Sequence, residues 1–451
     1  MTSPARLTIA KDTVESFVLK VSLYAVAFIG SVLISRALGP EGRGIYYLPV
    51  VAAATLVSIA KLGIEQANVY LFGTAKVSPG QLSGQNGLVA LVMGALGFFV
   101  LLGAPAALPS LFSDTPLVLL ALAGLAIPFS LHSQFTTGLT TMLGQVTWQS
   151  WAALIAGIVQ VAVIVGLYLA GVITPQAVLA TSLLSIALTW FLVIARFRVA
   201  GNSWLRWDSG LLATTLRQSL PLHIGMIFFY FHLRADTFLV KVIIGTTALG
   251  LYSVSVMLAE TMYLAMDSLA VALLPHQVAN KAEEAARNAL RAGRVIVMVG
   301  GCVALLWVVL GLPIIGYMFG AEFLPAYLPM VILLPGLLAL GVQRVCGPPI
   351  LRQGRPLRIA LVYALGLGVN VTLNLLLIPV WGIAGAATSS AISYSLGALV
   401  FLGWTAAIAD APWWEGVLPK REDARLLWSS SRELVSSIRS SASKPGGGSP
   451  T

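Results

Sequence analysis

Residues 34–50 read ISRALGPEGRGIYYLPV, and residues 240–256 read VKVIIGTTALGLYSVSV. Aligned without a gap, the two stretches share three residues at an offset of 206 positions: Gly39 with Gly245, Gly44 with Gly250, and Tyr46 with Tyr252. Each stretch lies between two long apolar runs, and its glycines are typical of a tight turn. The sequence therefore predicts an internal repeat in which each half begins with the same helical hairpin.

The composition of the chain indicates a membrane protein. Of 451 residues, 58% are hydrophobic and only 10% are charged, and the mean hydropathy is +0.89. Soluble domains carry roughly 25% charged residues, so this chain lacks the charge to cover a water-facing surface. Apolar runs of about twenty residues recur along it, each long enough to cross the hydrocarbon core. We expect an all-α polytopic membrane protein.

About twelve transmembrane helices are expected. They fall at 14–36, 44–72, 84–104, 116–138, 149–171, 175–195, 218–244, 248–274, 293–319, 325–345, 357–378 and 383–409. The repeat divides them into two six-helix lobes, residues 1–205 and 206–411. An even number of spans in each half gives parallel repeats, with a substrate path between the lobes. Residues 412–451 form a polar tail in which 422–439 are expected to make an amphipathic helix and the end to be disordered.

Basic residues predict the orientation, because short cytoplasmic loops carry an excess of Lys and Arg. One side of the predicted helices receives almost all of them: Arg6, Lys11, Lys76, Arg196, Arg198, Arg206, Arg217, Lys281, Arg287, Arg291, Arg294, Arg352, Arg355 and Arg358. Both termini are therefore predicted to be cytoplasmic. The net charge of +10 is explained by this placement, and a nucleic-acid partner is not expected.

Ionisable residues inside the predicted helices are the candidate functional groups, because a charge in the bilayer normally faces a cavity or a partner. Arg234, Asp236 and Glu260 lie about ten residues from the outer turns, near the midplane at 1.5 Å per residue. A deeper layer holds Lys20, Lys61 and Asp267, and the repeat superposes Lys61 on Asp267. The two lobes therefore present opposite charges at equivalent depth.

Structural interpretations of these charges stay open. Arg234 and Glu260 could form a buried ion pair, and Lys61 could pair with Glu65 four residues later on its helix. Lys20 could snorkel inward, and Lys241 is close enough to the outer surface that snorkelling is expected of it.

The arginines of the first hairpin need their own explanation, because the second copy has uncharged residues at both positions. Arg36 and Arg43 flank the turn at what is expected to be the outer mouth of the path. A local ion pair with Glu41 is the structural alternative.

We find no catalytic or metal-binding constellation in the sequence. The predicted outer loops are short and hold no cluster of histidines and carboxylates. We therefore expect a transporter that is not an enzyme and that needs no cofactor or metal, apart from a coupling ion.

Three stretches carry a resemblance to a known family: SRALGPEGRGIYYL, GLYSVSVMLAETM and NVTLNLLLIPVWGIAGAATSSAISY. They resemble the polysaccharide-biosynthesis branch of the multidrug/oligosaccharidyl-lipid/polysaccharide exporter superfamily, whose members include O-antigen-type flippases. The resemblance implies two six-helix lobes in a V with a central cavity that opens alternately to either side. It also implies a bacterial inner-membrane protein that turns an undecaprenyl-diphosphate-linked oligosaccharide from the cytoplasmic to the outer leaflet, working alone or beside a polysaccharide polymerase.

The resemblance gives the candidate residues their roles. Lys20, Lys61 and Arg234 would hold the diphosphate by charge, with Asp236 beside them in the substrate pathway. The carboxylates Asp236, Glu260 and Asp267 would couple transport to sodium ions or protons. At the outer mouth, Arg36 and Arg43 would receive the departing diphosphate or close the gate.

Three rival functions are weighed against this one. A multidrug exporter of the same fold would need an acidic, aromatic cavity for organic cations, whereas this path carries basic residues in both lobes. Flippases of peptidoglycan lipid II are expected to have fourteen transmembrane helices, whereas about twelve are predicted here. A membrane scaffold without transport would have no need of charges inside the bilayer.

Overall fold

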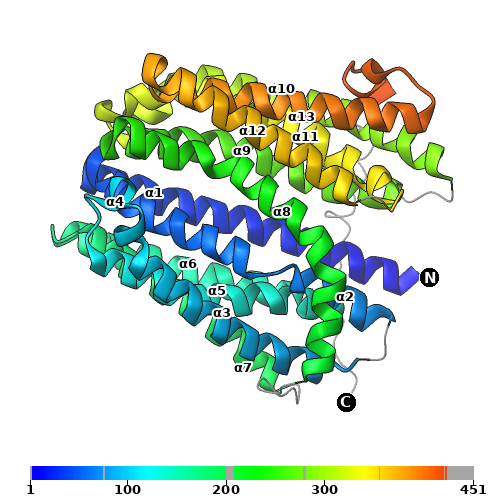
Figure 1. The fold of residues 1–451 in the computed structure, drawn as a ribbon, viewed down its shortest axis with the longest axis horizontal. Helices are drawn as coiled ribbons and strands as arrows, with labels where there is room; N and C mark the ends of the chain where they lie inside the picture. Colours follow the sequence, from blue (N-terminus) through cyan, green and yellow to red (C-terminus); the bar gives the residue numbers. More distant parts are fainter. Residues whose placement is uncertain are drawn as a thin grey trace, which may run out of the picture. The chain divides into compact units, whose positions relative to one another are not determined.

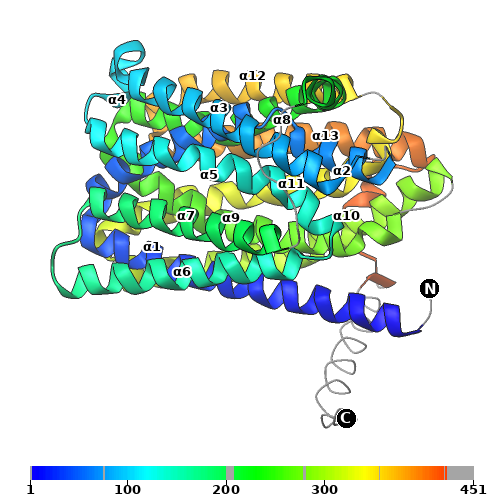
Figure 2. The ribbon, with the colours of Figure 1, turned by 90° about the horizontal axis from the view of Figure 1, so that it is seen from below.

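The structure is a computed structural model that describes residues 3–74, 77–199, 208–277, 281–354, 356–420 and 422–423. The described chain is helical (Figures 1 and 2). Its elements are α1 (Ser3–Ala60), α2 (Ile64–Thr74), α3 (Pro79–Ala107), α4 (Pro109–Phe112), α5 (Leu117–Met142), α6 (Val146–Leu169), α7 (Pro175–Val199), α8 (Ser209–Ile244), α9 (Thr246–Gln277), α10 (Ala282–Ile314), η1 (Ile315–Phe319), η2 (Ala321–Ala326), α11 (Tyr327–Leu351), α12 (Pro356–Trp381), α13 (Ile383–Ala409) and η3 (Trp413–Gly416).

Ten stretches of the described chain are long and apolar enough to cross a membrane. The first, Val18–Ala60, holds both arms of a hairpin, because α1 turns at Gly39. Helix α8 is not among the ten, although its 36 residues exceed the length of a span, because it carries more polar groups than the other long helices. When the two arms of α1 are counted separately and α8 is added, the described chain has the expected architecture of about twelve helices.

The predicted helix ends agree with the structure within a few residues for most spans. For the second span, the prediction of one continuous helix is wrong. The span was predicted to run unbroken over 44–72, whereas helix α1 ends at Ala60 and α2 begins at Ile64. Leu62 and Gly63 between them have φ values of 51° and 70°. Two successive residues in the left-handed region break the helix, and an apolar pattern alone does not reveal such a break.

The described chain divides into two compact units. The described residues within 1–258, 309–333 and 356–393 form the first, and those within 259–308, 334–354 and 394–423 form the second. In the first unit, α1 packs on α6, α3 on α5, and α8 on α12 (Figures 1 and 2). Figure 1 shows α8 as a long helix that bends. It contains Pro221, which removes one backbone hydrogen bond and explains a bend there.

Close backbone packing joins the helices of the second unit. A Cβ at Gly300 or Gly341 would overlap the side chain of Met266, so α9, α10 and α11 approach one another through small residues. Gly293 of α10 lies against the backbone of Gly416 in η3, and the hydroxyl of Thr405 in α13 donates to the carbonyl oxygen of Cys346 in α11.

The division into lobes at residues 205 and 411 stays a prediction. The predicted amphipathic helix over 422–439 and the disordered end lie outside the described residues, apart from positions 422 and 423.

Candidate functional site

The two hairpins of the predicted repeat have the same turn. Gly39 has φ 64° and ψ −178°, and Gly245 has φ 99° and ψ −174°. This combination is essentially confined to glycine, because any Cβ would clash with the backbone there. The alignment from the sequence therefore matches two equivalent backbone conformations.

The hairpins also pack on each other reciprocally. A Cβ at Gly44 would overlap the carbonyl oxygen of Thr246, and a Cβ at Gly250 would overlap the carbonyl oxygen of Pro40. Since Pro40 aligns with Thr246, each glycine contacts the partner hairpin at the same relative position. Reciprocal contacts of this kind are the signature of two-fold symmetry, here between the two hairpins.

Arg43 precedes Gly44 in the chain and is buried, with 5% of its surface exposed. Its Nε donates to the Ser253 hydroxyl at 2.7 Å, and its Nη1 donates to the hydroxyls of Ser31, at 2.9 Å, and Ser35. Its Nη2 has the Met257 thioether sulfur at 3.8 Å. All these partners are neutral, so among the described residues the positive charge of Arg43 is solvated by hydroxyls and not balanced by a carboxylate.

Arg43 lines a cavity of about 440 Å³ in the first unit. The walls come from both arms of α1, from α6 and α7, and from the start of α9. Their polar members besides Arg43 are small or neutral: Ser31, Tyr46, Tyr47, Gln160, Ser185, Thr189 and Ser253. The lining contains one guanidinium and no carboxylate, which suits an anion.

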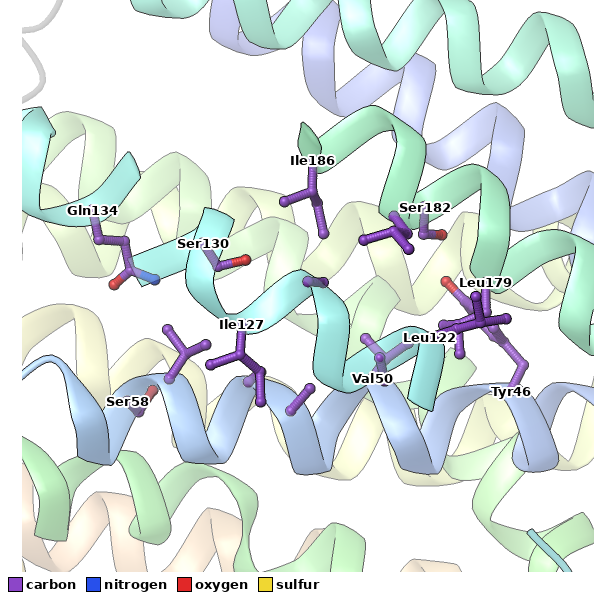
Figure 3. Close-up of a pocket in the computed structure, with 16 residues that line it drawn as sticks. Tyr46, Val50, Ser58, Leu122, Ile127, Ser130, Gln134, Leu179, Ser182 and Ile186 are labelled. Carbon is purple, nitrogen blue, oxygen red and sulfur yellow. The ribbon is translucent and has the colours of Figure 1, made fainter. Parts of the chain in front are cut away.

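A second cavity of about 260 Å³ adjoins the first, because Tyr46 and Val50 line both. Figure 3 shows the side chains around it, which come from the second arm of α1, from α5 and from α7. The walls are mainly aliphatic, and Ser58, Ser130 and Gln134 add neutral polar groups. The two cavities together give the first unit a mostly apolar space with one cation on its wall.

Arg36 has a different environment from Arg43. It is exposed, and it donates to the carbonyl oxygens of Tyr317 and Met318, to the latter at 2.6 Å. These carbonyls belong to the π-helical turn that ends α10, where helix carbonyls lack partners within the helix. Arg36 therefore caps a helix end. The hydrogen bonds described for Arg36 and Arg43 are to carbonyl and hydroxyl groups, and not to the Glu41 carboxylate that the sequence offered as an alternative partner. A role at the outer mouth stays a prediction for both.

Asp236 is the most buried of the predicted ionisable residues, with 2% of its surface exposed. Its carboxylate accepts hydrogen bonds from the Tyr252 hydroxyl at 2.6 Å, the Ser390 hydroxyl at 2.8 Å and the backbone N–H of Thr237 at 2.6 Å. Tyr252 is the residue that the repeat aligns with Tyr46. A buried carboxylate with these donors is oriented by its neighbours, as a group that serves an ion or a proton must be.

The cluster around Asp236 continues into α12 and α13. The side-chain amide of Asn370 donates to the hydroxyls of Ser390 and Ser393, both at 3.1 Å, and Asn374 donates to the side-chain oxygen of Asn370 at 2.9 Å. His232, one turn before Asp236, has its Nε2 3.0 Å from the Ser393 hydroxyl. Helices α8, α12 and α13 thus share one buried polar network.

The remaining predicted pathway residues, Lys20, Lys61 and Arg234, do not line the cavity beside Arg43. Lys20 is exposed on α1, and Arg234 is half-buried on α8, two residues before Asp236. Lys61 pairs with Glu65 at 3.1 Å, which is the local pair considered from the sequence. Their roles in substrate transport stay predictions.

Glu260 and Asp267 belong to the second unit. Glu260 is half-buried, and Asp267 forms an ion pair with Arg344 of α11, with Nε and Oδ1 2.8 Å apart. Arg344 was not among the residues predicted from the sequence. It occupies the last turn of a predicted helix, where basic residues are common and do not indicate a functional site. The coupling role of these carboxylates stays a prediction.

Lys241 does not snorkel, as the sequence suggested, but is buried in an ion pair. Its ammonium group lies 2.7 Å from a carboxylate oxygen of Asp114, in the segment between α4 and α5, and 2.7 Å from the Thr246 hydroxyl. Hydrogen bonds from Lys241, Thr246 and Ser113 lower the pKa of Asp114 to about 2. The pair joins the end of α8 to a loop more than a hundred residues earlier in the chain.

Comparison with known proteins identifies the family of the chain. The family model described as polysaccharide biosynthesis protein matches residues 9–280, which is more than half of the chain. The chain belongs to this family. The matched segment contains both hairpins of the repeat, Arg43 and Asp236. No curated protein matches the chain in sequence.

Solved structures share the fold at low sequence identity. An inward-facing multidrug resistance transporter of the MATE family has a TM-score of 0.65 at 14% identity, covering 86% of this chain and 94% of its own. The lipid II flippase MurJ, in an inward closed conformation, has a TM-score of 0.66 at 14% identity, covering 89% of each chain. A transporter of the MOP superfamily from Pyrococcus furiosus has a TM-score of 0.61 at 13% identity, covering 91% of this chain and 98% of its own. The member of the polysaccharide biosynthesis family described here therefore has the fold of that transporter superfamily.

Proposed function

We propose that the protein carries an undecaprenyl-diphosphate-linked oligosaccharide from the cytoplasmic to the outer leaflet of a bacterial inner membrane, by alternating access. Such a lipid combines an anionic diphosphate and a polar glycan, neither of which crosses hydrocarbon unaided. The observation that carries the proposal is the buried Arg43 guanidinium on the wall of the 440 Å³ cavity.

The environment of Arg43 favours an anionic ligand. A buried charge is costly unless a counter-charge or a set of hydrogen bonds compensates for it. Serine hydroxyls compensate the Nε and Nη1 edges of Arg43, whereas Nη2 has only a weak thioether acceptor. A diphosphate oxygen at Nη2 would supply the missing charge through a charge-assisted hydrogen bond.

The adjoining walls suit the rest of this cargo. Hydroxyl and amide groups in the two cavities can bind a polar head group, and the mostly aliphatic surface around them tolerates the first isoprene units of the lipid. The remaining tail would stay in the bilayer, where its transfer costs nothing.

A multidrug exporter fits this site less well. Organic cations are bound by carboxylates and by aromatic faces, and the described lining of both cavities contains no carboxylate. A lipid II flippase would share the diphosphate, and the family match with polysaccharide biosynthesis proteins supports the oligosaccharide over lipid II.

We assign the coupling of transport to Asp236. The carboxylate is buried, oriented by hydroxyl donors and joined to a network that reaches three helices. Those hydroxyls can reorient to accept instead of donate when a proton or a sodium ion binds the carboxylate, so the network needs no rearrangement of its backbone. We further propose that both termini are cytoplasmic and that a polysaccharide polymerase takes the delivered substrate.

The test is complementation of a strain that lacks the gene. Arg43→Gln keeps a polar hydrogen-bonding side chain and removes the charge, so surface polysaccharide should be lost while the protein level in the membrane stays normal. The matched control is Arg196→Gln. Arg196 is an exposed residue near the end of α7, and its guanidinium group lies over the ring of Trp148 in α6. Wild-type polysaccharide with Arg43→Gln would overturn the role of this residue and, with it, the diphosphate site.

A further inference from the structure

The ion pair between Asp267 and Arg344 is exposed, although both residues lie in apolar stretches that cross the membrane. Asp267 lies within Thr246–Val271 and Arg344 within Ala321–Leu351. Their side chains are 38% and 53% exposed. A charged side chain exposed to lipid hydrocarbon costs several kcal/mol, so ion pairs inside membrane proteins face the protein interior or water. We therefore infer that this face of the second unit meets water and not lipid.

Other polar groups of α9 share this face. Glu260, Tyr263 and Asp267 follow one another at intervals of three and four residues, which places them on one side of a helix. Arg344 joins this face through its ion pair with Asp267, so we group Glu260, Tyr263, Asp267 and Arg344 as one cluster. Ion coupling by Glu260 and Asp267 stays a prediction, and the ion pair of Asp267 with Arg344 adds a guanidinium group to the same face.

The mixture of charges identifies the class of ligand. A site for an anion would not place two carboxylates beside its arginine, and a site for a cation would not place an arginine beside its carboxylates. Sugar hydroxyl groups are donors and acceptors at once, so neighbouring carboxylate and guanidinium groups match them. The pair uses Nε of Arg344 and Oδ1 of Asp267. The outer nitrogens and the second carboxylate oxygen are the groups that adjacent hydroxyls would meet.

We propose that this cluster on α9 and α11, made of Glu260, Tyr263, Asp267 and Arg344, binds the glycan of the carried lipid through its hydroxyl groups. The Tyr263 ring adds an apolar surface for the face of a sugar ring. The members of the cluster on α9 lie about 15 to 26 Å along the helix from Gly250, at 1.5 Å per residue. The proposal rests on the proposed function, because it assumes a lipid-linked saccharide as cargo, and it separates recognition of the sugar from recognition of the diphosphate by Arg43.

Binding to the purified full-length protein tests the cluster with two probes. The first probe is the pool of lipid-linked saccharides extracted from cells that lack the gene, and the second is undecaprenyl diphosphate without sugar. The wild type should bind the first probe more tightly. In Arg344→Gln and Asp267→Asn that preference should fall by about tenfold, the loss expected for one or two hydrogen bonds to a charged group. Affinity for undecaprenyl diphosphate should stay unchanged in both variants.

A matched control and a second variant keep the outcomes distinct. Lys420→Gln removes one member of another exposed ion pair of the same unit, with Glu415, and should leave both affinities unchanged. Arg43→Gln should weaken both probes equally, so failure of the diphosphate site appears as an unchanged affinity in that variant alone. If the wild type shows no preference for the saccharide-bearing probe, or if Arg344→Gln keeps the preference, the sugar site is overturned.

Discussion

Gly44 and Gly250 occupy equivalent positions in two hairpins that are 206 residues apart, and each one lies against the backbone of the other hairpin. A Cβ at Gly250 would fall 3.0 Å from the backbone nitrogen of Gly44 and would overlap the Pro40 carbonyl. Backbones come this close only where neither residue has a side chain. The contact brings Arg43 to the Ser253 hydroxyl on the opposite hairpin, so the geometry of the candidate site depends on these two glycines.

The first prediction concerns this contact. Gly44→Ala should destabilise the protein by about 2 kcal/mol, because overlap with a backbone carbonyl forces the hairpins apart. The loss should appear as a lower midpoint of thermal unfolding in detergent, together with reduced transport. Gly301→Ala is the control, because a Cβ there meets no atom within 4 Å. Equal unfolding midpoints for the two variants would contradict the packing described here.

The second prediction concerns the pair of Lys241 and Asp114. Asp114→Asn should lower stability by about 1 kcal/mol, a modest loss because Asp114 is 56% exposed although Lys241 is buried. The control is Glu415→Gln, which breaks an ion pair between two exposed side chains and should have a smaller effect.

The pH dependence of the same pair has a definite sign. The pKa of Asp114 is lowered in the folded protein to about 2, from the ordinary value of 3.8. The pair therefore contributes its full stability above pH 3.8, and the contribution is lost as the pH falls toward 2. Unfolding midpoints of the wild type and Asp114→Asn should differ by a constant amount from pH 5 to 8 and converge below pH 4. A difference that disappears near neutral pH would contradict the assignment.

The third prediction concerns the segment that follows α13. Arg294 of α10 donates from Nε and Nη2 to both carboxylate oxygens of Asp423, at 2.7 and 3.0 Å, and its Nη1 donates to the carbonyl oxygen of Glu415 at 2.8 Å. Burial is the largest single effect on Asp423 and opposes its ionisation, but the hydrogen bonds and positive charges of Arg294 and Lys420 together outweigh it and lower the pKa of Asp423. Asp423→Asn should cost about 3 kcal/mol, because it leaves a buried arginine without its counter-charge.

Limited proteolysis measures this loss directly. Cleavage after residue 410 should be faster in Asp423→Asn than in the wild type, since the bidentate ion pair fastens the segment to α10. Lys420→Gln keeps that ion pair and serves as the control. Wild-type rates of cleavage in Asp423→Asn would show that the ion pair is not what fastens the segment to α10.

Much of the architecture could be predicted from the sequence, because length and hydropathy determine where a membrane helix begins and ends. The Gly39 and Gly245 turns could be predicted as well, since a glycine at equivalent places in two halves is a backbone requirement. Asp236 is buried in a polar network, as a charged residue of a membrane helix should be, and its depth in the bilayer stays a prediction.

The direction that each charged residue faces could not be predicted. A helix that is apolar on all sides has no amphipathic pattern, so the sequence does not say whether Lys20 or Arg43 points inward. Arg43 was expected in a loop at the mouth and lies buried against serines of both hairpins, one of them 210 positions away. Lys241 and Asp114 are 127 positions apart, and a pairing at that distance leaves no local pattern.

The last prediction concerns coupling through Asp236. In proteoliposomes, an imposed sodium or proton gradient should accelerate transport of the lipid-linked saccharide by the wild type. Asp236→Asn keeps the shape of the side chain and can still accept from Tyr252 and Ser390, but it cannot bind a proton or balance a cation. The variant should therefore transport at the same slow rate with and without a gradient. Ser390→Ala removes one hydroxyl donor at 2.8 Å and keeps the carboxylate, so it should retain coupling with a shifted dependence on ion concentration. A wild type that is indifferent to both gradients would remove the coupling role, and gradient-driven transport by Asp236→Asn would transfer it to another group.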